Sequence, residues 1–195
     1  MLRIEADLIG AAPLSFSAPI SSLKKTGEGH DAFEERTWRE RCRADKNGMA
    51  YIPPQALKNC LSEVAKFLGE TVPGKKGSTY TKHFEAGIMV MDPIQLGVKS
   101  ADIPGERLFV PASGKRGDGK RVWKTFPTLA QWSGHCVVYV LDPVLLDKPE
   151  KVDEYLRHAG KFIGLGRFRP RNNGYYGRFE VENFKVIREA LNKSA

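Results

Sequence analysis

The chain of 195 residues is predicted to form a single α+β domain, residues 1–195, and three observations predict it. Segments near both ends alternate apolar and polar residues, as strands with one buried face do. Residues 54–68 and 147–160 carry apolar side chains at helical spacing. Residues 101–134, rich in Gly, Pro and Lys, interrupt this pattern as an inserted basic hairpin arm. The remaining order, βαββαβ, is that of ferredoxin-like and RRM-like cores with an antiparallel sheet.

The first part of the chain predicts a strand followed by a β-hairpin. Leu2–Phe16 alternates apolar and polar residues, with a break near Gly10. Residues 26–30 have the composition of a loop. Thr37–Arg43 alternates again, and the sequence Lys-Asn-Gly at 46–48 favours the positive φ of a tight turn. We therefore expect a hairpin that contains Thr37–Arg43.

The middle of the chain predicts a helix and two strands. In the helix over 54–68, Pro54 suits the first turn and Gly69 suits the C-cap. The apolar segment 84–98 predicts a central strand that is buried on both faces. Residues 135–143 predict the strand that follows the arm.

The last part of the chain predicts a helix, a loop and a strand. Residues 147–160 carry acidic residues early and basic residues late, which matches the helix dipole. Asp147 is the expected N-cap and Gly160 the expected terminator. The final strand is expected within residues 176–187.

The composition favours a polyanionic partner. Lys and Arg number 31 against 23 Asp and Glu, which gives a formal net charge of +8. This charge favours nucleic acid first, and an acidic membrane surface or an acidic protein only after it. No stretch approaches the run of about 18 apolar residues that spans a membrane, and no export signal is visible. We therefore expect a cytoplasmic protein without a membrane partner.

The stretch GLGRFRPRNNGYYGRF, residues 164–179, is called here the Gly-Arg loop. Its glycines leave the main chain open to close approach by a phosphate. Its arginines offer planar donors for phosphate oxygens, and Tyr175 and Tyr176 offer faces on which bases stack. The combination suits a single-stranded nucleic acid. The alternative is a solvated loop whose glycines only serve turns.

The arm contains a second basic cluster, GKRGDGKRVWKTF, residues 114–126. On a hairpin this charge could reach along a phosphate backbone or toward an adjacent subunit, and Trp123 is a candidate stacking wedge. The alternative is a solvated tip with Trp123 packed at its base. A further alternative is that the arm binds an acidic neighbouring protein.

Few residues suggest chemistry. His30 and Asp31 are adjacent in the first loop and are weak candidates for a proton acceptor and a cleavage group. The other histidines are scattered, and Cys42, Cys60 and Cys136 have no metal-binding spacing. We therefore expect no metal site, no cofactor and reduced cysteines. Because no nucleophile elbow or phosphate loop occurs, the sequence favours binding over catalysis.

The run KNGMAYIPPQALKNCLSEVAKFL, residues 46–68, resembles a segment of the RAMP superfamily, the repeat-associated mysterious proteins of CRISPR systems. In that family a turn and a Tyr-Ile-Pro strand lead into a helix. The matching residues here are Tyr51, Ile52, Pro53, Leu57 and Lys58. Residues 54–56 and 59 depart from the pattern, which has two serines and a glycine there. The Gly-Arg loop is similar to the Gly-rich, Arg-bearing loop before the family's last strand.

The resemblance is to the backbone-subunit branch of this family. It implies a ferredoxin-like core, head-to-tail stacking of copies and an arm that interrupts base stacking. It also implies that Lys58 and the arginines of the Gly-Arg loop contact the backbone of a guide strand. In some relatives an aspartate in the first loop cuts target RNA, and Asp31 lies in that region.

The sequence as a whole predicts a non-catalytic protein that binds single-stranded RNA or DNA. The leading hypothesis is a repeating subunit that coats a guide RNA in a CRISPR-type effector complex for antiviral defence, with copies of itself and other effector subunits as partners. A stand-alone or phage-borne single-strand binder, or an inhibitor of such a complex, is the second hypothesis. A metal-independent endoribonuclease is the third. The residues expected to contact nucleic acid are Lys24, Lys25, Lys58, Lys115, Arg116, Lys120, Arg121, Trp123, Lys124, Arg167, Arg169, Arg171, Tyr175, Tyr176 and Arg178.

Overall fold

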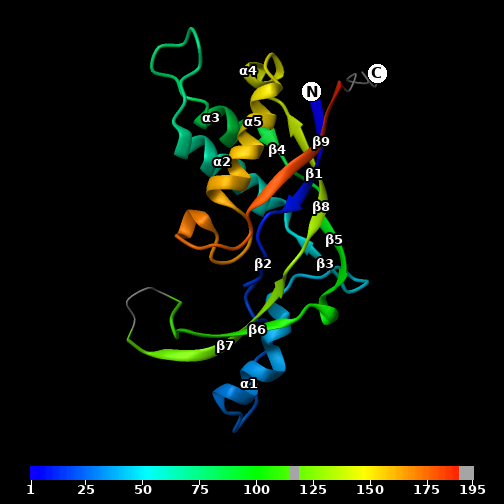
Figure 1. The fold of residues 1–195 in the computed structure, drawn as a ribbon, viewed down its shortest axis with the longest axis vertical. Helices are drawn as coiled ribbons and strands as arrows, with labels where there is room; N and C mark the ends of the chain where they lie inside the picture. Colours follow the sequence, from blue (N-terminus) through cyan, green and yellow to red (C-terminus); the bar gives the residue numbers. More distant parts are fainter. Residues whose placement is uncertain (115–118, 189–195) are drawn as a thin grey trace.

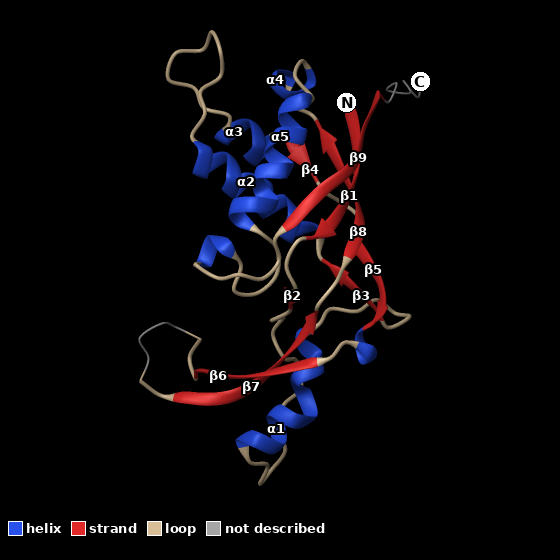
Figure 2. Cartoon of the chain, in the orientation of Figure 1, coloured by secondary structure: helices blue, strands red, loops and turns tan. Residues whose placement is uncertain are grey.

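A computed structural model of the protein describes residues 1–114 and 119–188 (Figure 1). The molecule is elongated. A four-stranded sheet and the helices on one of its faces form the core at one end of the molecule. The arm projects near the opposite end (Figure 2). Two residues predicted to contact nucleic acid, Lys115 and Arg116, lie outside the described residues.

The four-stranded sheet confirms the predicted βαββαβ core. Its strands are β1 (Leu2–Gly10), β4 (Ile88–Met89), β8 (Ser133–Val140) and β9 (Phe179–Arg188). They lie in the order β4-β8-β1-β9, and all neighbours are antiparallel. β1 is an inner strand, and its residues at positions 2, 4, 6 and 8 are buried. The alternation that predicted this strand therefore marks its two faces.

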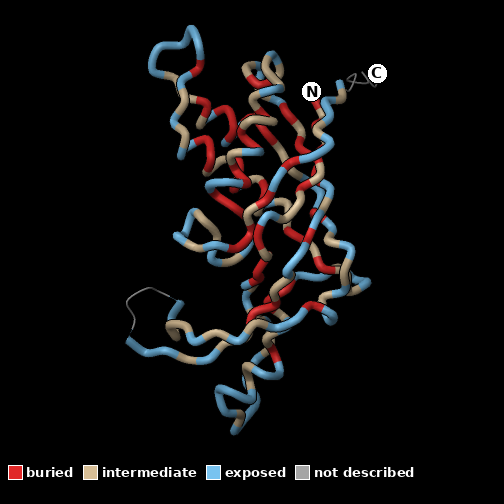
Figure 3. Tube along the Cα trace, in the orientation of Figure 1, coloured by how far each residue is buried: buried red, intermediate tan, exposed pale blue. Residues whose placement is uncertain are grey.

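Two longer helices and two short ones cover one face of the sheet. α2 (Pro54–Leu68) and α5 (Glu150–His158) are the longer, and α3 (Thr81–Ala86) and α4 (Pro143–Leu146) the shorter. Residues 57, 60, 61, 64 and 65 of α2 are buried and belong to the same core cluster as β1 (Figure 3). α2 begins with Pro54, and Gly69, which has a φ of 59°, is its C-cap, as predicted.

The remaining elements connect this core to the arm and to the Gly-Arg loop. They are β2 (Leu14–Ser15), α1 (His30–Thr37), η1 (Trp38–Arg41), β3 (Met49–Ile52), β5 (Ile94–Lys99), η2 (Ser100–Asp102), β6 (Gly105–Pro111), β7 (Arg121–Leu129), η3 (Ala159–Ile163) and η4 (Pro170–Asn172). β3 pairs with β5, and β7 is the middle strand between β2 and β6. β6 and β7 form the hairpin expected in the arm, with Phe109 opposite Trp123.

The predicted strand over Thr37–Arg43 is wrong. Thr37 is the last residue of α1, where its hydroxyl donates to the carbonyl oxygen of Phe33 at 2.6 Å, and residues 38–41 form the helical turn η1. Glu34 and Arg41 form an ion pair across this turn. These contacts within one helical segment override the alternating pattern. The turn at 46–48 joins residues 44 and 50, which form an antiparallel bridge, and the main-chain amide of Tyr51 donates to the carbonyl oxygen of Arg43 at 3.1 Å.

The predicted central strand over 84–98 is also wrong. The segment is divided among the end of α3, the strand β4 and the strand β5. β4 has only two residues and lies at the edge of the sheet, and β5 pairs with β3 instead. Pro93 lies between the two strands and has no amide hydrogen for a ladder bond. The inner strands are therefore β1 and β8.

Both predicted ends of the second core helix lie elsewhere. α5 begins at Glu150, and the side chain that caps a helix here is Asp142, which accepts hydrogen bonds from the first amides of α4. At its other end the chain continues past Gly160 through η3 as far as Gly164, which has a φ of 74°. Asp147 instead lies at the C-cap of α4, and Gly160 lies within η3, where its lack of a side chain leaves room for the carbonyl oxygen of Phe179.

Gly160 packs closely against β9. A Cβ atom at Gly160 would overlap the carbonyl oxygen of Phe179, whereas one at Gly29 would meet nothing within 4 Å. We expect Gly160→Ala to lower the free energy of unfolding by about 2 kcal/mol through overpacking. Gly29→Ala, the control, should leave it nearly unchanged. Urea unfolding measures both, and equal midpoints for the two variants would contradict this packing.

Candidate nucleic-acid interface

One extended segment, residues 13–18, holds both the arm and the Gly-Arg loop. On one side it pairs with β7 through β2 and through the amide of Phe16. On the other side its carbonyl groups accept hydrogen bonds from amides of the Gly-Arg loop. The N···O distances are 3.0 Å for Phe16 to Pro127, 2.7 Å for Arg167 to Ser15 and 2.7 Å for Gly177 to Pro13. Two regions distant in sequence are thereby fixed to the same piece of main chain.

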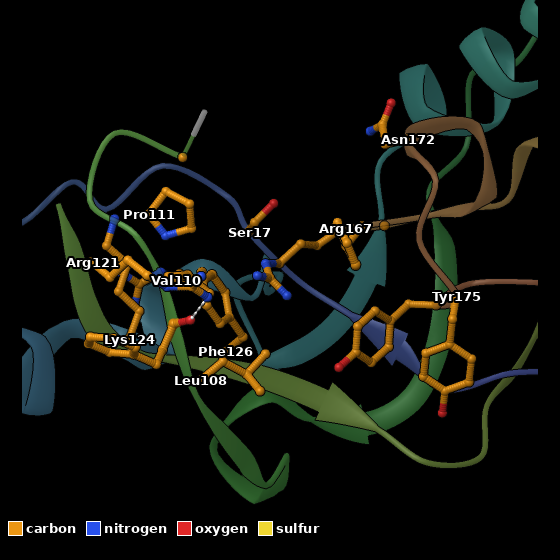
Figure 4. Close-up of a pocket in the computed structure, with 16 residues that line it drawn as sticks. Ser17, Leu108, Val110, Pro111, Arg121, Lys124, Phe126, Arg167, Asn172 and Tyr175 are labelled. Carbon is orange, nitrogen blue, oxygen red and sulfur yellow. Dashed lines mark hydrogen bonds between the residues drawn. The ribbon is translucent and has the colours of Figure 1, made fainter. Parts of the chain in front are cut away.

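Between the arm and the Gly-Arg loop lies a cleft of about 1060 Å³ (Figure 4). A second cleft, of about 430 Å³, extends from it to the beginning of α2. The two clefts share four lining residues and form one path, called here the groove. The shared residues are Ser17, Arg41, Gly166 and Asn172.

The groove is basic and partly aromatic. Its basic lining residues are Arg41, Arg121, Lys124 and Arg167 in the larger cleft and Arg43 and Arg169 in the smaller. Its aromatic lining residues include Phe109, Phe126, Phe168, Tyr175 and Tyr176. Among the described residues that line either cleft there is no Asp or Glu. A surface of this kind attracts phosphates and offers faces for bases.

Arg167 projects into the larger cleft from the Gly-Arg loop (Figure 4). Its guanidinium carbon lies 3.7 Å from the ring centre of Phe126, which is a cation–π contact. Burial lowers the pKa of Arg167 from its usual value, although the group stays cationic at neutral pH. Its Nη1 atom is buried and has no hydrogen-bond partner in the part of the chain that the structure describes. The donor is therefore held in place and unused.

Arg41 lines both clefts and is held by hydrogen bonds to Glu34 and Thr125. Its Nη1 and Nη2 atoms donate to the two carboxylate oxygens of Glu34 at 2.7 and 2.8 Å, and Nη1 also donates to the carbonyl oxygen of Thr125 at 3.0 Å. Glu34 in turn accepts a hydrogen bond from the amide of Thr125 at 2.7 Å. The pair joins α1 to β7. Its two charges compensate each other, so Arg41 contributes less net charge to the groove than Arg167 does.

The arm contributes Lys124 and Arg121. Lys124 donates to the carbonyl oxygen of Ala112 at 3.0 Å, and Arg121 donates to that of Phe109. Because these acceptors are neutral, both positive charges remain available to an anion. Lys120 is exposed beside them. Trp123 is 49% exposed, but it does not line the groove. It packs against Phe109 with ring centres 5.2 Å apart, so it is not buried at the base of the arm.

The residues of the Gly-Arg loop have different environments. Arg169 donates to Glu63 at 2.9 Å, so its charge is compensated. Arg171 is exposed and lies outside the lining of the groove. The hydroxyl of Tyr176 donates to Glu106 at 2.8 Å, and burial together with this bond raises the pKa of Tyr176 to about 12. Tyr175 is 53% exposed and lines the larger cleft. The guanidinium group of Arg178 donates to the carbonyl oxygen of Tyr175 at 3.4 Å.

The glycines of this loop serve turns and close internal packing. Gly164, Gly166 and Gly177 have φ values of 74°, 75° and 72°. A Cβ atom at Gly177 would overlap the carbonyl oxygen of Leu165. Their backbone approaches other parts of this chain, which agrees with the alternative interpretation from the sequence. The groove therefore presents side chains, and not bare glycine backbone, to a ligand.

Phe168 is the strained residue of the loop. Its φ is 46°, a left-handed conformation that is costly for a bulky side chain. Its ring is 42% exposed and lines the larger cleft. Strain of this kind is often kept where it positions a functional group. Here it turns an aromatic face toward the groove.

Several predicted contact residues lie away from the groove. The ammonium group of Lys58 donates to Ser62 at 2.9 Å and to the carbonyl oxygens of Phe84 and Glu85 at 3.1 and 2.9 Å. Burial lowers its pKa. It therefore caps the end of α3, and the contact with a guide strand that the family resemblance implies stays a prediction. Lys24, Lys25, His30 and Asp31 are exposed before and at the start of α1, and none of them lines either cleft.

The open face of the four-stranded sheet is not basic. β1 places Arg3, Glu5 and Asp7 there, on the side opposite its buried residues, with Lys185 of β9 opposite Glu5, and Arg3 and Glu5 form an ion pair. Asp7 accepts hydrogen bonds from His135 and Asn183, each at 2.8 Å, and these bonds lower its pKa. RRM domains bind RNA on this face through aromatic residues. Here the carboxylates offset the basic residues of the face, whereas no carboxylate lines the groove among the described residues.

The sequence interpretation missed Arg41, Arg43, Ser17 and Asn172. Arg41 and Arg43 lie in a segment that was expected to be a strand, where only their charge could have indicated a role. Ser17 and Asn172 carry no sequence signal. Their place in the groove follows from the hydrogen bonds that hold residues 13–18.

Comparisons with known proteins find a shared fold. No protein-family model matches the chain, and no curated protein sequence matches it. Among solved structures, it is similar to the Type III-B Cmr-beta bound to cognate target RNA, with a TM-score of 0.58 and 12% identity over 96% of this chain and 61% of that one. It is also similar to Cmr6 from Pyrococcus furiosus, with a TM-score of 0.52 and 12% identity over 93% of this chain and 99% of Cmr6.

A chain of a Type IV-B CRISPR complex is similar as well, with a TM-score of 0.54 and 12% identity over 99% of this chain and 95% of that one. The likeness is one of fold. The chain spans 61% of the length of the Type III-B chain and nearly all of the other two. The fold that the RAMP resemblance implied is confirmed, and membership of that family stays a prediction.

Other chemistry is sparse in the part of the chain that the structure describes. Cys42, Cys60 and Cys136 are free and buried, and burial raises their pKa to about 11, 12 and 12. No group of three metal-binding side chains occurs within residues 1–114 and 119–188. None of the helices in these ranges is long and apolar enough to cross a membrane.

The contribution of the Glu34–Arg41 ion pair to stability can be tested by substitution. Glu34→Gln keeps the size of the side chain but leaves a buried guanidinium without its counter-charge, so we expect a loss of about 3 kcal/mol in the free energy of unfolding. Glu35→Gln removes an exposed carboxylate from the same helix and is the matched control. Urea unfolding compares them. A loss no larger than that of the control would show that the pair does not hold α1 against β7.

Proposed function

We propose that this protein is an RNA-binding subunit of a CRISPR-type effector complex and that it holds single-stranded RNA in the groove. The observation that carries the proposal is the meeting of the two basic segments found in the sequence. The arm and the Gly-Arg loop face each other across one path that contains no lining carboxylate among the described residues. The net charge of +8 also favours the binding of a polyanion such as RNA.

The residues that line the groove favour a single-stranded nucleic acid over a duplex as the ligand. Phosphates of the strand would contact Arg167, Arg43 and the uncompensated charges of the arm, because guanidinium groups bind phosphate oxygens well. Bases would stack on Phe168 and Tyr175, whose rings are partly exposed in the larger cleft. In a duplex the base faces are already stacked and could not reach these rings. Leu108 and Val110 add apolar contact area.

The shared fold supports RNA and effector subunits as partners. The Type III-B structure is that of a complex bound to target RNA, and the Type IV-B structure is that of a CRISPR complex. Both resemble this chain along nearly its whole length. We extend these partners to the present protein as part of the proposal.

Head-to-tail stacking of copies along a guide RNA is the arrangement that we propose within such a complex. The arm supports it because it projects beyond the core (Figure 1). Outside the groove lining it exposes Trp123, which is 49% exposed, and Arg107, whose guanidinium carbon lies 5.1 Å from the ring centre of Trp123. Exposed Trp and Arg side chains are typical anchors of protein interfaces. These side chains could contact the next copy while other residues of the arm line the groove.

The other hypotheses from the sequence gain less support. A stand-alone or phage-borne single-strand binder would use the same groove and differs only in its partners. For an endoribonuclease, His30 and Asp31 would have to act on RNA from outside the groove, since both are exposed at the start of α1. No observation favours that arrangement.

The groove predicts a specific loss of RNA binding. We expect the double variant Arg43→Ala/Arg167→Ala to bind an unstructured RNA at least about tenfold more weakly, because two charge-assisted phosphate contacts are removed. The slope of log K against log salt should fall in magnitude by about 1.4, which is the value for two phosphates of a single strand. Fluorescence anisotropy over a salt series measures both quantities.

The matched control removes the same charge from a distant site. Lys75 and Lys76 are exposed in the loop between α2 and α3, at the end of the molecule opposite the arm (Figure 1). Lys75→Ala/Lys76→Ala should retain nearly the wild-type affinity. If the two double variants lose affinity equally, binding follows net charge alone and the groove is not the site. Arg169→Ala is avoided because it would leave Glu63 unpaired.

A further inference from the structure

Two neutral polar side chains lie where the two clefts meet. Ser17 and Asn172 line both clefts, one from the segment 13–18 and the other from the Gly-Arg loop. Arg167 lines the larger cleft together with them (Figure 4). Both side chains are exposed, and neither has a hydrogen-bond partner within the described residues. A ligand in the groove could therefore use them.

Both residues are held by the main chain on either side. The main-chain amide of Phe16 donates to the carbonyl oxygen of Pro127 at 3.0 Å, and that of Ala18 donates to the carbonyl oxygen of Arg41 at 2.9 Å. Ser17 is therefore held between two residues whose main chain is hydrogen-bonded. Asn172 is the last residue of the helical turn η4, and its main-chain amide donates to the carbonyl oxygen of Arg169 at 2.8 Å. The bond from Arg167 to Ser15 joins the two sides. Such preorganisation lowers the cost of binding.

The chemistry of these groups differs from that of the rest of the groove. Guanidinium and ammonium groups only donate hydrogen bonds, and phosphates of RNA and DNA accept them equally well. Aromatic rings stack on the bases of either nucleic acid. A hydroxyl and a primary amide each donate and accept. The 2′-hydroxyl of ribose also does both, and it is the group that distinguishes RNA from DNA.

We infer that Ser17 and Asn172 make the groove selective for RNA by hydrogen-bonding the 2′-hydroxyl of a sugar whose adjacent phosphate is bound by Arg167. The inference rests on the proposed function, because it assumes that the strand lies in the groove. It assigns separate tasks to neighbouring residues. Arg167 supplies affinity for either nucleic acid, and Ser17 and Asn172 supply the difference between them.

The test compares one base sequence on two sugars. The affinities of the full chain for oligouridine and for oligodeoxyuridine of the same length are measured by fluorescence anisotropy at one salt concentration. We expect the wild type to prefer RNA. Ser17→Ala and Asn172→Ala should each lower RNA affinity about fivefold, the value of about one hydrogen bond, and leave DNA affinity unchanged. The double variant should bind both probes nearly equally.

The controls separate this inference from the proposed function. Ser133→Ala and Asn47→Ala remove the same kinds of exposed side chain outside the groove and should keep the RNA preference. Arg167→Ala should weaken RNA and DNA by the same factor. A wild type that binds RNA and DNA equally, or variants that keep the full preference for RNA, would overturn the sugar-reading role alone. If the wild type binds neither probe, the proposed function fails with it.

Discussion

The arrangement of the whole binding surface depends on residues 13–18, an extended segment whose hydrogen-bonding groups are used on both sides. β7 pairs with it on one side, and amides of the Gly-Arg loop donate to it on the other. Main-chain bonds allow little variation in spacing, so the arm and the loop stand at a fixed separation. Gly166 is required there because a side chain would press against Ser15 and Leu14. The glycines of the loop thus contribute to the groove indirectly.

The groove combines charges of three kinds. Arg41 and Arg169 are compensated by carboxylates outside the lining and act mainly as supports. Lys124 and Arg121 are anchored by neutral carbonyl oxygens and keep their charge. Arg167 rests on Phe126 and keeps an unused donor. Counting basic residues in the sequence treats all of these alike. In the structure only some of these cations are paired with a carboxylate, so their net charges differ.

The sequence predicted what depends on local pattern. Alternation identified β1, helical spacing identified α2, and the Gly- and Lys-rich interruption identified the arm. Both basic segments of the site were also visible. What could not be predicted depends on contacts between distant residues. Pairing with β3 rather than with the main sheet decides the position of β5, and the carbonyl groups at the end of α3 accept hydrogen bonds from the ammonium group of Lys58. That the arm faces the Gly-Arg loop follows from residues 13–18, whose sequence carries no such signal.

Photo-crosslinking with a thiouridine-containing RNA, followed by identification of the modified peptides, tests the central claim most directly. If the strand lies between the arm and the Gly-Arg loop, crosslinks will form on both sides of the groove, at Phe168 or Tyr175 and at Phe109 or Phe126. Crosslinks at Tyr139, an intermediate-exposure residue of β8 in the four-stranded sheet, with none on the arm or the loop, would contradict it.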